Sequence, residues 1–153
     1  MATPPATLGP FMYKKFAEIE PILVACGGTA QAASTHVARK YLRTQLLDTV
    51  AGSARPFTRE NTFEMASAAA LIKGGAKTSA AFAYASNFLT MIEFKEPFPE
   101  WFIFAAGNLK RAIHADNINL SKVRRELGNP VTLSIVNLHE IKKMVDDLYD
   151  GGE

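Results

Sequence analysis

Few residues in this sequence have the types and spacing of a catalytic, nucleotide-binding or metal-binding motif. Residues 74–78 read Gly-Gly-Ala-Lys-Thr and resemble part of a phosphate-binding loop. That motif needs Gly directly before the Lys and another Gly five residues earlier. These places hold Ala76 and Leu71. A helix end followed by a Thr cap explains the same residues, so no nucleotide site is predicted.

The other catalytic candidates are also incomplete. His139 and Glu140 begin a zinc-protease motif, but the place of its second His holds Lys143. Cys26 is the only cysteine, which excludes an intrachain disulfide, and no pattern places a base beside its thiol. The three histidines lack the spacing of metal ligands. We therefore expect no metal, no cofactor and no enzymatic activity, and a structural role for Cys26.

Positive charge is the clearest chemical pattern in the first half of the chain. His36, Arg39, Lys40 and Arg43 lie at i, i+3, i+4 and i+7, which is one face of a helix. Like charges at this spacing cost about a few tenths of a kcal/mol per pair. Solvation of the side chains is the common explanation for such a face. Contact with nucleic-acid phosphates is the sharper prediction.

A second basic cluster occurs later in the sequence, with His114 next to it. Its members are Lys110, Arg111, Lys122, Arg124 and Arg125. Residues 120–128 weakly resemble the first helix of a helix-turn-helix motif, but Arg124 stands where a small residue is usual. Sequence-specific DNA binding is therefore the less favoured interpretation. Contact with the phosphate backbone needs only the positive charge of the same residues.

The charges are unevenly distributed, although the net charge is only +2. Residues 31–125 hold 13 Lys and Arg against 7 Asp and Glu, whereas residues 126–153 hold 2 against 6. The sequence thus has a basic body and an acidic tail. Such asymmetry predicts either an anionic partner or subunits that meet head to tail, unless it has no role.

Aromatic residues gather around two prolines near the middle of the chain. They are Phe94, Phe98, Trp101, Phe102 and Phe104. One small domain can bury only some of them. If Phe98 and Trp101 stay exposed, they mark a site for a protein partner.

The elements that must position these residues are predicted to be helices. Apolar periodicity and capping residues indicate helices over residues 10–26 (kinked at Pro21), 30–50, 62–73, 79–93, 100–114, 118–127 and 138–150. Residues 131–135 alternate apolar and polar side chains, so a short extended segment is allowed there. The prediction is an all-α, single-domain bundle of six to seven helices.

The chain divides into an extended arm over residues 1–10 and a helical domain over residues 11–150. Three prolines exclude a regular helix from the arm. The longest apolar stretch, residues 79–92, is shorter than the roughly 20 residues that span a bilayer. No signal peptide is visible. We expect a cytoplasmic protein, or one within a particle that is assembled inside cells, and no membrane association.

These observations favour a structural protein that assembles with itself. The expected picture is a homo-oligomeric coat or nucleocapsid-like subunit, as in a virion, whose two basic clusters contact RNA or DNA phosphates. The alternative is a helical protein-interaction or regulatory module that uses the aromatic residues, with the degenerate helix-turn-helix as a DNA-binding variant.

Overall fold

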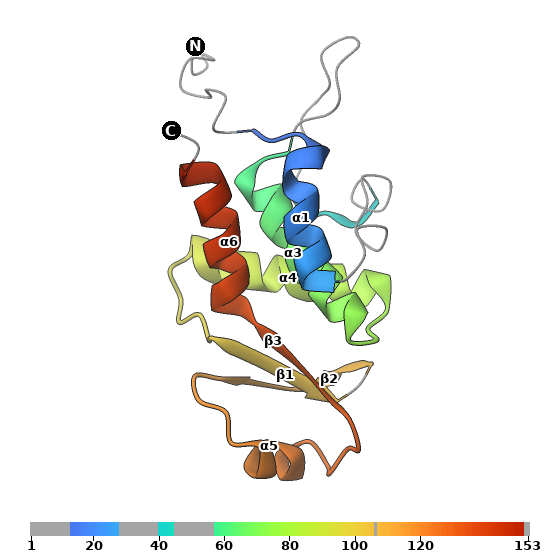
Figure 1. Ribbon diagram of the computed structural model, residues 1–153. Coiled ribbons are helices and arrows are strands. Elements are labelled where there is room, and N and C mark those ends of the chain that lie inside the picture. Colours follow the sequence, from blue (N-terminus) through green and yellow to red (C-terminus); the bar gives the residue numbers. More distant parts are fainter. Residues whose placement is uncertain (1–12, 28–39, 45–56, 106, 152–153) are drawn as a thin grey trace.

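The computed structural model describes residues 13–27, 40–44, 57–105 and 107–151 (Figure 1). Its helices are α1 (Phe16–Gly27), α3 (Arg59–Lys73), α4 (Thr78–Glu93), α5 (Leu120–Glu126) and α6 (Leu138–Asp150). Its strands are β1 (Trp101–Ala105), β2 (Asn108–Ala115) and β3 (Leu133–Asn137). They form one antiparallel sheet in the order β2-β1-β3.

The sheet separates two layers of unequal size. Helices α1, α3, α4 and α6 lie on one side of it, and α5 lies alone on the other (Figure 1). Phe102 and Phe104 of β1 point into the main core, which the larger layer encloses. Ile103, between them in sequence, packs instead against α5. The central strand is therefore covered on both faces.

The prediction of an all-α bundle is wrong, because residues 101–115 form a β-hairpin where a helix over residues 100–114 was predicted. Aromatic and β-branched side chains favour a strand at β1. A strand buried on both faces reads as a continuous apolar run, which periodicity alone does not distinguish from a buried helix. Gly107 adopts a positive φ of 75° at the turn and ends any helical path. The fold is mixed α and β.

Helix α3 begins one turn earlier than its sequence suggested. The Thr58 side chain accepts a hydrogen bond from the backbone of Asn61, whose side chain accepts one from the backbone of Thr58. Asn61 is thus the third residue of a capping box rather than its first. The shift leaves four polar side chains of α3 buried: Asn61, Thr62, Glu64 and Ser67.

Two further predictions meet the limits of the described residues. The arm over residues 1–10 lies outside them. Most of the helix predicted over residues 30–50 also lies outside them, including His36 and Arg39. Within residues 40–44 the helical conformation ends at Tyr41, so the helix does not continue through Leu42 as predicted.

Candidate functional site

Strand β3 is at one edge of the sheet, and among the residues that the structure describes it pairs only with β1. The backbone N–H of Leu138 donates to the carbonyl of Glu100 at 2.7 Å, which fixes the hydrogen-bonding phase of this pair of strands. In an antiparallel pair, successive residues turn their backbone groups alternately toward and away from the partner strand. Leu133, Ile135 and Asn137 therefore direct their backbone N–H groups away from β1, and Leu133 and Ile135 do the same with their carbonyls.

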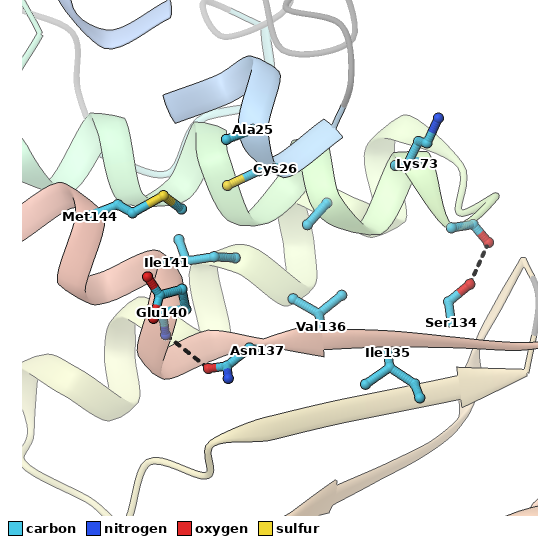
Figure 2. Close-up of a pocket in the computed structure, with 12 residues that line it drawn as sticks. Ala25, Cys26, Lys73, Ser134, Ile135, Val136, Asn137, Glu140, Ile141 and Met144 are labelled. Atoms are coloured by element: carbon cyan, nitrogen blue, oxygen red, sulfur yellow. Dashed lines mark hydrogen bonds between the residues drawn. The ribbon is translucent and has the colours of Figure 1, made fainter. Parts of the chain in front are cut away.

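A groove of about 360 Å³ runs beside this free edge (Figure 2). We call it the β3 groove. The last turn of α1, the end of α3, the strand β3 and the first turns of α6 contribute its walls. Its lining residues are Ala25, Cys26, Ala70, Lys73, Gly74, Ser134, Ile135, Val136, Asn137, Glu140, Ile141 and Met144. Most of them are apolar or small, and the two charged residues, Lys73 and Glu140, are exposed.

Gly74 brings the end of α3 close to the sheet and so shapes one wall of the groove. A Cβ at this position would lie 2.5 Å from Cζ of Phe104 and 2.7 Å from Oγ of Ser134. The Ser134 hydroxyl donates to the Gly74 carbonyl at 3.3 Å, which ties β3 to α3 (Figure 2). The Gly-Gly segment thus packs the end of a helix against a strand.

The groove lacks an activated nucleophile. Burial raises the pKa of the Cys26 thiol to about 12, so the thiol stays protonated at neutral pH. Asn137 uses its side-chain oxygen to accept the Glu140 N–H at 2.8 Å and donates its amide to the Glu100 carboxylate at 3.2 Å. The groove offers a backbone edge and apolar contacts.

A second hollow of about 350 Å³ lies between α4 and β2. Its titratable side chains are those of Tyr84, Glu96 and His114. Burial lowers the pKa of His114, whose ring lies edge-on to Phe88 and Phe102. Within the described part of the chain, no hydrogen bond joins these three side chains, so they do not form a base and nucleophile pair.

The structure brings five of the nine predicted nucleic-acid-binding residues together. Lys110 and Arg111 of β2 and Lys122, Arg124 and Arg125 on α5 form what we call the basic end of the molecule. A Cβ at Gly128 would lie 2.1 Å from Nη2 of Arg111, which places this guanidinium at the end of α5. Arg124 donates from Nε to the Pro130 carbonyl at 3.0 Å, and Lys122 is 3.9 Å from Glu126. Lys110, Arg111 and Arg125 form no ion pair with any residue that the structure describes.

Lys40 and Arg43 do not join this end. Arg43 pairs with Glu93 of α4 at 3.0 Å, and the Lys40 ammonium lies 5.4 Å from the centre of the Tyr41 ring. Both are on the helical side of the sheet, whereas α5 is on the opposite side. His36 and Arg39 lie outside the described residues, so the predicted helical face of four basic residues is not seen as a unit.

The predicted partner residues Phe98 and Trp101 are half-buried and have packing partners. Phe98 stacks on His139 with ring centres 5.5 Å apart and also contacts Phe63. Trp101 packs beside the cluster formed by β1 and α5. Phe94 is the exposed aromatic residue of this segment, at 71 %.

The acidic tail is largely neutralised within the molecule. Arg59 pairs with Asp146 and with Asp150, Lys142 with Asp146, and Lys143 with Asp147. These aspartates lie on α6, at the opposite end of the molecule from α5 (Figure 1). These pairs reduce the negative charge that α6 offers to the basic surface of a neighbouring subunit.

Sequence reasoning did not find the β3 groove. The one signal available was the alternating pattern over residues 131–135, which overlaps β3. Its position at the edge of a sheet depends on β1 and β2, whose strands were predicted as helix.

In the described part of the chain, no group of three or more His, Cys, Asp or Glu side chains could hold a metal ion. No helix there has the length and apolar character needed to cross a bilayer. No protein-family model, curated protein or solved structure matches this chain.

Proposed function

We propose that this protein is a binding and assembly module that takes up an extended polypeptide segment along the free edge of β3. The observation that carries the proposal is the coincidence of an unpaired strand edge with an apolar groove. An added strand gains main-chain hydrogen bonds from the edge, and its alternate side chains enter the groove. This is the mode of recognition known as strand addition.

The edge lacks the features that usually protect such strands. Natural edge strands carry lysines, prolines or bulges that prevent pairing with another chain. Residues 131–137 hold no charged residue and no proline, and the β3 register with β1 is regular. Val131 is 96 % exposed and Ile135 is 42 % exposed. Within the described residues, nothing pairs with this apolar edge.

Selection from a library of displayed random peptides tests this proposal, with the protein held at low micromolar concentration. Selected peptides should alternate apolar and polar residues and should lose binding to Ile135→Pro. Proline removes an N–H that points away from β1, so the existing sheet keeps its hydrogen bonds. Ile135→Thr is the matched control because it keeps both the N–H and a β-branched side chain. Peptides that bind Ile135→Pro as well as the control would refute strand addition.

The basic end supports a second function, contact with nucleic-acid phosphates. Residues 107–132 carry five Lys and Arg against Asp116 and Glu126. Lys110, Arg111 and Arg125, which form no ion pair with the described residues, come from both β2 and α5. A coat or nucleocapsid-like subunit would combine this surface with assembly through β3.

Binding of a fluorescent oligouridylate over a series of salt concentrations tests the second function. Replacing Lys110, Arg111 and Arg125 by Gln should weaken binding and reduce the magnitude of the salt slope by about 0.7 for each lost phosphate contact. The matched control replaces the exposed Lys15, Lys77 and Lys95, which lie outside the basic end. An equal loss in both variants would show that only the net charge matters.

A further inference from the structure

The β3 groove leaves open which extended segment occupies it, and β3 itself is a segment with the required properties. We propose that the occupant is β3 of a second copy of this chain, paired antiparallel across a two-fold axis at Ile135. The inference rests on the proposed function and names its partner. It would join the two sheets into one of six strands, in the order β2-β1-β3-β3-β1-β2.

The backbone of the edge is complementary to itself. The N–H and carbonyl of Ile135 both point outward, so two copies related by the axis form a hydrogen-bonded pair at this residue. In the same register, Asn137 of one copy lies opposite Leu133 of the other. The Asn137 N–H then donates to the Leu133 carbonyl. The reverse bond does not form, because the Asn137 carbonyl is directed into α6 as its N-cap. About four main-chain hydrogen bonds result.

The side chains also suit a two-fold contact. This axis places Ile135 opposite its own copy, so a charge at that position would oppose a like charge. Residues 129–138 contain no charged residue. Ile135 faces Ile135 of the partner on the side of the sheet that carries α5, where its exposed fraction of 42 % leaves apolar area to cover.

The apolar surface continues from the strand onto the helical layer. The β3 groove connects Ile135 to Ala25 at the end of α1, and Val24 beside it is 42 % exposed. Figure 2 shows Ala25 and Cys26 on the ribbon that faces Val136 across the groove. Two copies would place their grooves next to each other, so contact between the helical layers adds to the strand pairing. Protection of this strip explains how the chain keeps an unguarded edge.

Sedimentation equilibrium of the full chain over a concentration series tests the proposal. Wild type should form a dimer. Ile135→Lys and Ile135→Glu should each raise the dimer dissociation constant by about tenfold or more, because like charges then meet at the axis. An equimolar mixture of the two variants should recover association as a heterodimer, since Lys and Glu face each other. Ile118→Lys introduces the same charge at another partly exposed isoleucine and should leave the dimer intact.

Three outcomes would overturn the inference. They are a monomeric wild type up to millimolar concentration, an Ile135→Lys variant that still dimerises, and a mixture that does not associate. Circular dichroism of each variant shows whether it is folded, and Ile135→Pro gives a second block of the same edge. Peptide selection is carried out below the dimer dissociation constant measured by sedimentation, where the β3 edge of the monomer is free to bind a peptide. A monomer that binds selected peptides through Ile135 would thus refute self-pairing and leave the proposed function standing.

Discussion

Glu64 is completely buried, and its Oε1 accepts hydrogen bonds from both the backbone N–H and the hydroxyl of Thr44, twenty residues earlier in the chain. Its other oxygen, Oε2, accepts the backbone N–H of Arg43 at 3.1 Å. The Thr44 hydroxyl in turn accepts the side-chain amide of Asn61 at 2.8 Å. One carboxylate thus holds the segment over residues 40–44 against α3.

Replacing Glu64 by Gln should lower the free energy of unfolding by about 2–4 kcal/mol. Only one of the two side-chain atoms remains an acceptor, so a buried backbone N–H loses its partner. Urea unfolding followed by circular dichroism measures the change. Glu60→Gln on the exposed side of the same helix is the control and should cost less than about 0.5 kcal/mol. Equal effects would mean that the buried network does not contribute to stability.

Deprotonation of the Tyr149 phenol should lower the stability of the protein at alkaline pH. Burial raises the pKa of its phenol to about 12 from the usual 10.0. The hydroxyl donates to the Phe57 carbonyl at 2.9 Å and contacts the Thr62 hydroxyl at 2.7 Å. The folded state holds this proton more tightly than the unfolded state. Its contribution is therefore complete below pH 10 and falls as the pH rises toward 12.

Thermal unfolding between pH 8 and pH 12 checks this dependence. Tyr149→Phe should flatten the alkaline decline and should cost about 1–2 kcal/mol at neutral pH through its lost hydrogen bonds. Cys26 has a pKa raised in the same direction, so both proteins are compared in a Cys26→Ala background. A decline of the same steepness with Phe at position 149 would assign the effect to other groups.

Gly74→Ala should destabilise the protein by about 1–3 kcal/mol, because the added methyl group meets the Phe104 ring and the Ser134 side chain. Denaturant midpoints measure the loss. Phe104→Leu removes the ring atom nearest to Gly74. The double variant should therefore lose less stability than the two single variants added together. Strict additivity would show that the end of α3 moves freely away from β1.

Arg59→Gln should raise the pKa of Asp150. The guanidinium donates to this carboxylate and to that of Asp146, and the contact with Asp150 holds its pKa below the usual value. The stabilisation is present above the unfolded pKa near 3.8 and is lost as the pH falls. Carboxyl chemical shifts measured by NMR between pH 2 and pH 6 follow the titration. Lys143→Gln breaks the neighbouring pair with Asp147 and should leave Asp150 unchanged.

The sequence predicted the parts of the fold that depend on helical periodicity. The apolar pattern of residues 79–93 predicted a helix, and Ala81, Phe82, Ala85, Phe88 and Leu89 of α4 are buried. The last helix, predicted over residues 138–150, is confirmed, and its N-cap Asn137 accepts the Glu140 N–H. Local signals of this kind act within a few residues, so they are readable without knowledge of the tertiary structure.

The sheet and the β3 groove depend on contacts between distant segments. Phe102 and Ile103 are adjacent in sequence but pack into different cores. Both can be apolar because α5 covers the second face of the strand. The apolar residues of the whole segment also fit the inner face of a helix over residues 100–114. The groove needs the ends of α1 and α3 to meet β3, which no local pattern encodes. The basic end could be found in part, because charge is visible in a sequence even where its geometry is not.

The small layer beneath the sheet has a consequence for how the molecule opens. Of the residues that the structure describes, only Ile103, Val123 and Leu127 are buried in that layer, whereas the main core holds most of the buried apolar residues. Regions with few buried contacts open at lower free energy than the rest of a fold. Amide hydrogens of α5 should therefore exchange with deuterium well before those of α3 and α4. The basic end would then unfold locally while the helical layer stays folded.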